Sequence, residues 1–279
     1  MSAWDIALVA AVSVMGTALA YLRSPQHKAF VLMLPVPFTL ATLALGRPVD
    51  ATNVLAMGAL FGYTIGVWFL HVRRRWPIVA AIVVCALAYC VAGAGIARVC
   101  PAGDAVFWGA VILVFIAGLA LVRALPYRAE PSHRTPLPVW VKLPAIALVI
   151  AGLVAVKQQL GGFTTMFPMV GVVAAYEARH SLWTIVRRIP WILVIMAPVM
   201  GLIRLTQGRL GLPSALALGW LLVLLQLWRL RLYYAGQAAH ATENAVRCRH
   251  DPSDPSDLSD LSDLSDPCRA PHRADPAEP

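Results

Sequence analysis

The chain has 279 residues, of which 59% are hydrophobic and 13% are charged, and its formal net charge is +9. Soluble domains are roughly 45–50% apolar and about 25% charged, so this composition excludes most soluble folds. The positive charge lies beside apolar segments, a placement typical of membrane orientation rather than of nucleic-acid binding. Two of the five cysteines lie within one apolar run, where thiols usually behave as small hydrophobes, and no disulfide framework is indicated.

Several apolar segments approach the length of about 20 residues that a transmembrane helix needs. There are nine of them: 4–22, 29–45, 51–71, 77–97, 105–125, 138–156, 162–178, 189–206 and 212–234. The second is short, and the seventh contains Gly162 and Pro168. The first carries Asp5 on its N-terminal side and is followed by Arg23 and Lys28, the reverse of a signal peptide, so we expect it to be retained. We predict an all-α polytopic membrane protein with about nine transmembrane helices.

Lysine and arginine are unequally divided between alternate loops. One set of loops holds only five of the 23, namely Arg47, Arg98, Lys157, Arg204 and Arg209. The other loops and the C-terminal region hold the remaining 18. Because lysine and arginine are enriched on the cytoplasmic side, we expect the N-terminus outside and the C-terminus in the cytoplasm. The expected location is an inner membrane of bacterial type, with the lipid bilayer as the first partner.

An internal repeat organises the chain. At one constant offset, Thr52, Gly58, Tyr63, Arg74, Arg75 and Pro77 fall on Thr165, Gly171, Tyr176, Arg187, Arg188 and Pro190. Each copy predicts an apolar helix that ends at arginines, followed by a proline that opens the next helix. An even number of spans in each copy gives both copies the same orientation, so we expect one extra helix and two parallel four-helix repeats.

The predicted divisions follow from this repeat. We expect an N-terminal transmembrane helix over 1–28, a first four-helix repeat over 29–128 and a second over 129–235. From residue 251 to 266 aspartate recurs at every third position. Low complexity, proline and charge prevent a packed core, so we predict a disordered acidic cytoplasmic tail over 236–279.

Groups for enzymatic chemistry are scarce. Before the tail the acidic residues are Asp5, Asp50, Asp104, Glu130 and Glu177, and no carboxylate cluster able to hold Mg²⁺ is among them. The sequence also lacks the common nucleophile, zinc-protease and phosphate-loop motifs. We therefore predict no catalytic residues, no metal site and no cofactor, and an integral-membrane enzyme is the least favoured of three classes.

The candidate transport-path residues are Glu177, Tyr176, Tyr63, Arg179 and His180. Ionisable groups inside a span are costly and often functional. In one interpretation Glu177 titrates within a cavity and couples proton movement to transport. In the other it lies at the cytoplasmic interface, pairs with a nearby arginine and caps the end of its helix.

The second half of the chain resembles the small GlpM-type inner-membrane proteins. The resemblance is carried by Gly161-Gly162, Phe167-Pro168, Tyr176, Leu182, Arg187 and Leu212-Pro213. The first half departs from it, with Pro48-Val49 and Val54-Leu55 at the positions of the Gly-Gly and Phe-Pro elements. The resemblance implies a compact multi-span unit, associated loosely with envelope polysaccharide production, and it provides no catalytic residues.

Two functions remain beside the enzyme. A small-molecule permease or exporter of secondary-transporter type is favoured, because duplicated bundles with proline-broken helices suit alternating access. The alternative is a non-enzymatic accessory membrane protein, such as one in envelope polysaccharide production. A transporter requires polar groups that converge between the two halves, whereas an accessory protein requires a dry interface there. The expected partners are a small-molecule substrate or another membrane protein, and no nucleic acid.

Overall fold

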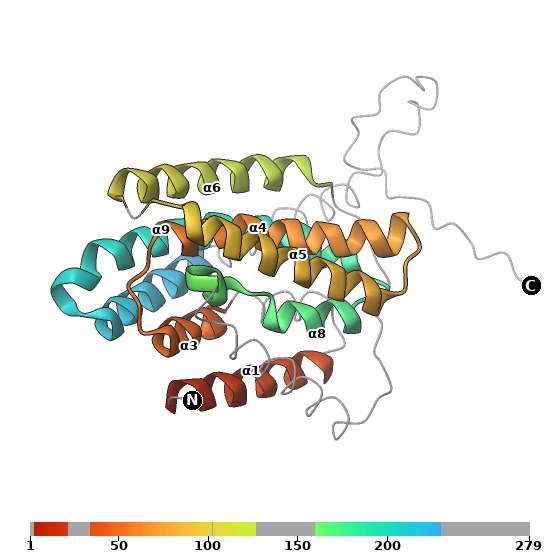
Figure 1. The fold of residues 1–279 in the computed structure, drawn as a ribbon, viewed down its shortest axis with the longest axis horizontal. Coiled ribbons are helices and arrows are strands. Elements are labelled where there is room, and N and C mark those ends of the chain that lie inside the picture. Colours follow the sequence, from red (N-terminus) through yellow and green to blue (C-terminus); the bar gives the residue numbers. More distant parts are fainter. Residues whose placement is uncertain (1–2, 22–33, 102, 127–159, 230–279) are drawn as a thin grey trace, which may run out of the picture. The chain divides into compact units, whose positions relative to one another are not determined.

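The computed structural model describes residues 3–21, 34–101, 103–126 and 160–229. All regular structure in these ranges is helical (Figure 1). The chain divides into two units, Met1–Val223 and Leu224–Pro279. The packing described below lies within the first unit.

The helices follow the apolar segments closely. They are α1 (Ala3–Tyr21), α3 (Val36–Leu45), α4 (Ala51–Trp68) with its π-helical extension η1 (Phe69–Arg73), α5 (Ile78–Val99), α6 (Asp104–Ala124), the 3₁₀ helix η2 (Gly161–Met166), α8 (Met169–Glu177), α9 (Leu182–Leu210) and a last helix, Leu212–Arg229. Five helices are long and apolar enough to cross a membrane: Ala51–Arg73, Ile78–Val99, Asp104–Ala124, Leu182–Leu210 and Leu212–Arg229. The chain therefore has the architecture of an integral, multi-pass membrane protein.

Four predicted spans are not in this set. Segment 4–22 forms the 19-residue helix α1, which is not one of the five. Segment 138–156 lies outside the described residues. Segment 29–45 is described from residue 34, and its helix begins at Val36 because Pro35 precedes the first turn and Pro37 occupies it. Segment 162–178 is not one helix, since η2 ends before Pro168 and α8 follows with nine residues.

The prediction that Pro190 opens a helix is wrong. In the first copy Pro77 does precede α5, after the arginines that end η1. In the second copy α9 begins at Leu182, so Arg187, Arg188 and Pro190 lie inside its first half. Proline removes one backbone donor from a helix, and neighbouring helices in a membrane bundle make that loss tolerable.

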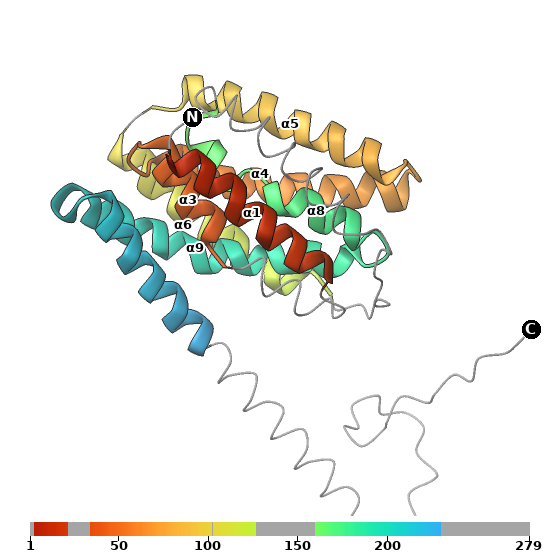
Figure 2. The ribbon, with the colours of Figure 1, turned by 90° about the horizontal axis from the view of Figure 1, so that it is seen from below.

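Helix α4 is the centre of the bundle. It packs against α5, α6, α9 and η2, while α1 lies along α3 and α8 (Figure 2). The most extensive contact joins α6 to α9. Gly118 of α6 allows this approach, because a Cβ there would lie 3.0 Å from the Cβ of Leu193.

The outer faces of α5 and α6 are apolar. Large exposed side chains on them are Val79, Val83, Leu87 and Val91 on α5, and Ile112, Leu113 and Ile116 on α6. Soluble monomers rarely expose contiguous apolar patches of this kind. These faces are suited to contact with lipid.

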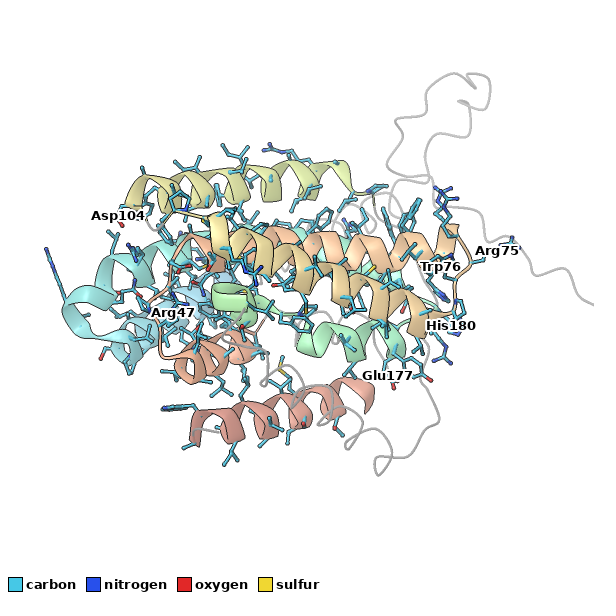
Figure 3. All side chains as sticks on the ribbon, in the orientation of Figure 1. Arg47, Arg75, Trp76, Asp104, Glu177 and His180 are labelled. Atoms are coloured by element: carbon cyan, nitrogen blue, oxygen red, sulfur yellow. The ribbon has the colours of Figure 1, made fainter. Side chains whose placement is uncertain are left out.

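Basic side chains gather at one end of the bundle, which we call the basic end. There the rings of Trp68 and Trp183 lie 5.0 Å apart, and Arg187 Nε donates to the carbonyl of Leu125 at the end of α6. The arginines at this end are Arg73, Arg74, Arg75, Arg123, Arg179, Arg187 and Arg188. Arg75 and His180 lie here, whereas Arg47 and Asp104 lie at the opposite end (Figure 3).

Cys100 provides a test of orientation, because it follows α5 and therefore lies at the opposite end. Burial raises the pKa of its thiol, and the Asp50 carboxylate raises that pKa further. In a variant whose other cysteines are replaced, we expect a membrane-impermeant maleimide to label Cys100 in intact cells. The labelling rate should rise steeply with pH and increase in Asp50→Asn, which restores thiolate by lowering the pKa. Labelling only after permeabilisation would reverse the expected orientation.

Candidate functional site

The break between η2 and α8 lies inside the bundle, and all six residues of η2 are buried. Backbone groups buried away from water need hydrogen-bond partners within the protein. The N–H of Gly162 donates to Thr52 Oγ1 at 3.0 Å. The hydroxyl of Tyr89 donates to the carbonyl of Phe163 at 2.9 Å. Helices α4 and α5 thus supply partners that a continuous helix would supply to itself.

Asn53 links this break to the start of α4. Its Oδ1 accepts from the N–H of Asp50 at 2.8 Å, while the Asp50 carboxylate accepts from the N–H of Thr52, which forms a capping box. Its Nδ2 donates to Thr165 Oγ1 at 2.9 Å, and Thr165 in turn donates to the carbonyl of Gly162 at 2.7 Å. One buried amide therefore caps α4 and joins it to η2.

The approach of η2 to α4 requires glycine at position 162. A Cβ there would lie 2.2 Å from Thr52 Oγ1 and 2.6 Å from the backbone nitrogen of Asn53. The preceding Gly161 has φ +52°, a conformation that side chains rarely adopt. On the other side of η2, a Cβ at Gly93 would lie 2.9 Å from the Phe163 ring. The Gly-Gly pair is thus a packing requirement of the break.

These contacts join the two predicted copies of the repeat. Thr52 and Asn53 belong to the first copy, and Gly162 and Thr165 to the second. Polar groups do converge between them, as a transporter requires. The groups bond to one another, however, so this cluster is a closed structural contact.

A cavity of about 90 Å³ lies beside the break. It is bordered by α1, α3, α4, η2, α8 and α9, and most of its lining is aliphatic, aromatic or proline. The lining side chains that carry a hydroxyl are Tyr63, Thr64 and Thr165. No charged side chain is among the described residues that line it.

The three hydroxyls differ in their hydrogen bonding. Thr64 donates to the carbonyl of Leu60 at 2.8 Å, and Thr165 donates to Gly162 as above. The side chain of Tyr63 is 4% exposed, and its hydroxyl has no hydrogen-bond partner within the described part of the chain. Tyr63 thus lines the cavity, and its hydroxyl is buried within the bundle.

The other predicted site residues lie at the basic end of α8, and none belongs to the cavity lining. Arg179 donates to the carbonyl of Tyr176 at 3.4 Å and lies over the Tyr176 ring. Glu177 is the last residue of α8 and is 2% exposed, and both interpretations of its role stay predictions. His180 follows α8 in the turn that leads to α9. The structure thus brings Tyr63 to the cavity and leaves proton coupling by Glu177 a prediction.

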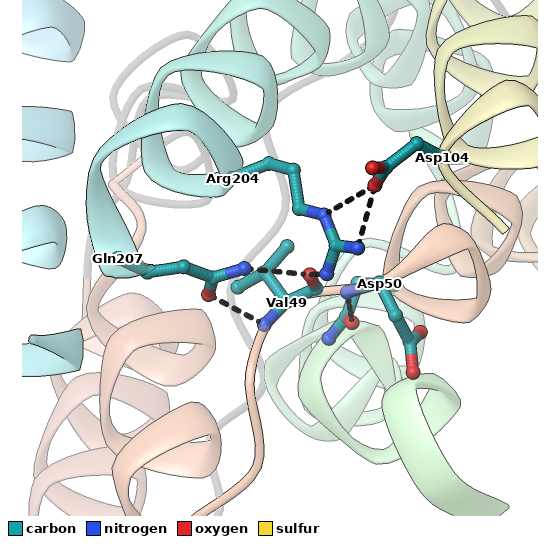
Figure 4. A network of polar contacts seen from close by, with 6 residues as sticks. Val49, Asp50, Asp104, Arg204 and Gln207 are labelled. Carbon is teal, nitrogen blue, oxygen red and sulfur yellow. Dashed lines mark hydrogen bonds and ion pairs between the residues drawn. The ribbon is translucent and has the colours of Figure 1, made fainter. Parts of the chain in front are cut away.

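A second polar network lies at the opposite end (Figure 4). Arg204 of α9 forms an ion pair with Asp104 at 2.7 Å and donates to the carbonyl of Val49 at 3.2 Å. The Gln207 amide bonds both backbone groups of Val49, at 2.9 and 3.1 Å. The sequence indicated Arg204 only as a loop charge. Its spacing of three residues from Gln207 on one helix face is the signal that predicts their joint action.

Within residues 3–21, 34–101, 103–126 and 160–229, no group of three or more His, Cys, Asp or Glu could hold a metal ion. Comparison with protein-family models, with curated proteins and with solved structures finds no match. The site is therefore interpreted from its own geometry.

Gly162→Ala should destabilise the protein by about 1–3 kcal/mol, the usual cost of overpacking, because the added methyl group meets Thr52 and Asn53. The matched control is Gly58→Ala in α4, where a Cβ would meet nothing within 4 Å. Thermal unfolding of each purified variant in detergent measures its stability. Equal midpoints for the two variants would refute the close approach of η2.

Asn53→Ala should cost about 1–3 kcal/mol, since it leaves buried groups without partners. Thr165→Ala should cost less when Asn53 is already absent, because the two side chains bond directly. Thr42→Ala is the control, as its hydroxyl bonds only within its own helix, to Phe38. Strictly additive losses for Asn53 and Thr165 in unfolding measurements would argue against their hydrogen bond.

Proposed function

We propose that the protein is a permease or exporter that moves a small molecule across the membrane by alternating access. The observation that carries this proposal is the cavity beside the buried break between η2 and α8. Transporters commonly bind their substrates where discontinuous helices from two repeats meet within the bilayer. Here the cavity borders α4 of the first predicted copy and η2 and α8 of the second.

The finer architecture belongs to the same proposal. It comprises nine spans, one extra helix with two parallel four-helix repeats, an outside N-terminus and an inner-membrane location. Its support is the basic end, where the arginines of alternate loops gather, and the meeting of Thr52 and Thr165 in one cluster. The resemblance of the second half to GlpM-type proteins is kept as part of the alternative, a non-enzymatic accessory protein.

The mechanism that we propose uses the short elements. η2 and α8 contain six and nine residues, and side-chain hydrogen bonds from α4 and α5 hold η2 in place. Loss of a few such bonds would free the segment to shift without unwinding a long helix. A shift in one direction opens the cavity to one side of the membrane, and a shift in the other direction opens it to the opposite side.

Alternating access is testable without knowledge of the substrate. Thr64→Cys and Ala175→Cys place thiols at the cavity in a chain whose native cysteines are replaced. We expect a small charged methanethiosulfonate to label both from either side, in right-side-out and inverted vesicles. Val114→Cys in α6 is buried but does not line the cavity, and it should stay unlabelled. Labelling of the cavity from one side only, or from neither, would contradict transport and favour an accessory role.

A further inference from the structure

We infer that the turn between η1 and α5 binds the phosphate headgroup of an anionic phospholipid. This segment, residues 69–76, contains Arg73, Arg74 and Arg75, and we call it the arginine turn. It lies at the basic end and lines no part of the cavity, and Arg75 points away from the bundle (Figure 3). The bound lipid is therefore a partner distinct from any transported molecule.

Hydrogen bonds give the arginine turn a defined shape. The N–H of Trp76 donates to the carbonyl of Leu70 at 3.0 Å, and Nδ1 of His71 donates to the carbonyl of Trp76 at 2.8 Å. Arg75 has φ +59°, a left-handed conformation that side chains adopt only rarely. The arginines therefore occupy defined positions on a hydrogen-bonded turn.

The three arginine side chains are exposed, and their charges are not neutralised. The guanidinium of Arg73 lies 5.7 Å from the centroid of the Trp68 ring, and that of Arg74 lies 5.6 Å from the centroid of the Phe69 ring. An aromatic ring stabilises a guanidinium but offers it no acceptor oxygen. In the described part of the chain no carboxylate forms an ion pair with any of the three.

The acidic residues of the bundle lie away from this turn. Asp50 caps the start of α4 and Asp104 begins α6, both at the opposite end, where Asp104 pairs with Arg204. Glu177 lies at the basic end, but it is buried. The arginine turn thus carries uncompensated positive charge. The planar set of N–H donors on arginine matches the oxygens of a phosphate group.

The neighbouring apolar side chains indicate a lipid rather than a soluble anion. Phe69, Val72 and Trp76 are exposed beside the arginines, Trp76 to 42%. Tryptophan is enriched at the depth of the lipid headgroups. The exposed apolar face of α5 starts just after the turn, at Val79 and Val83. A lipid whose phosphate binds the arginines can therefore lay an acyl chain along α5.

Dioleoyl phosphatidylglycerol and dioleoyl phosphatidylcholine are matched probes, because they share their acyl chains and differ in net headgroup charge. Native mass spectrometry of the delipidated full-length protein in neutral detergent measures the binding of each. An arginine near an anionic surface contributes about fivefold in affinity, so we expect phosphatidylglycerol to bind at least roughly tenfold more tightly. Equal affinities for the two lipids would overturn the proposal.

Replacement of Arg73, Arg74 and Arg75 by glutamine removes the charge of the turn. We expect this triple variant to lose most of its preference for phosphatidylglycerol, while phosphatidylcholine binds as before. Unfolding midpoints in detergent confirm that the variant is folded. A folded triple variant that keeps the full preference would contradict the assignment of this surface.

The matched control replaces Arg47, Arg98 and Arg209 by glutamine. These arginines are also exposed, they lie at the opposite end, and their loss changes the net charge by the same amount. We expect the control variant to keep most of the lipid preference. Equal losses in the two triple variants would show that binding follows net charge, and the arginine turn would not be a lipid site.

Arg75→Gly separates the effect of charge from that of folding. Glycine adopts φ +59° readily, so this variant removes one guanidinium without straining the turn. We expect the preference for phosphatidylglycerol to fall about fivefold, the contribution of one arginine, while the unfolding midpoint is not lowered. An unchanged preference in Arg75→Gly would count against the proposal.

Soluble anions distinguish a lipid headgroup from a free ligand. Inorganic phosphate and a short poly-aspartate peptide carry anionic oxygens but no acyl chain. At the same molar concentration as the lipid, neither should displace phosphatidylglycerol, because neither contacts the apolar face of α5. Displacement by either one would make the arginine turn a site for a soluble anion and refute the lipid assignment.

Discussion

The structure depends on one constraint, which is that the backbone of a broken helix must be hydrogen-bonded inside a bundle that lipid surrounds. Water cannot satisfy the freed groups of η2, so other helices have to. Thr52 and Asn53 at the start of α4 bond the Gly162–Thr165 turn, and Tyr89 of α5 bonds the carbonyl of Phe163. Removing these partners would leave buried polar groups without compensation, which is why the break and the two helices form one unit.

This constraint also explains the distribution of small and polar residues. The capping box of Asp50 and Asn53 would stabilise α4 in any setting, yet here the same amide extends to η2. Gly162 is needed because the two backbones approach more closely than a methyl group permits. The polar cluster is thus fully used in holding the fold, and the cavity beside it is lined mainly by apolar side chains. Because the polar groups of the break bond one another, the cavity can be apolar without leaving them unpaired.

Composition and charge predicted the class of the protein well. Apolar length alone located the five long helices, although Arg187 and Arg188, which we expected in a loop, lie inside α9. Apolar length and charge position depend only on residues that are neighbours in the sequence, so a short stretch of sequence is enough to recognise them. The candidate Tyr63 emerged from the repeat, and the cavity that it lines was not foreseeable, because its walls come from six elements far apart in the chain.

Other features could not be predicted for the same physical reason. Hydropathy treats 162–178 as one span, but the partners that stabilise its break lie about 110 residues earlier, at Thr52 and Asn53. Pro190 resembles a helix start in isolation, whereas the packing of α9 on α6 carries the helix through it. Arg204 and Gln207 recognise the backbone of Val49, which becomes their neighbour only after folding.

Helix α6 contacts α9 at its start, in its middle and just beyond its end. Arg204 bonds Asp104 at its first residue, Leu193 packs on Gly118 in its body, and Arg187 bonds the carbonyl of Leu125 just beyond its end. Rotation or sliding of one helix against the other would disturb all three places together. We therefore expect α6 and α9 to behave as one rigid unit, so that a rearrangement of the protein would move the other helices relative to this pair.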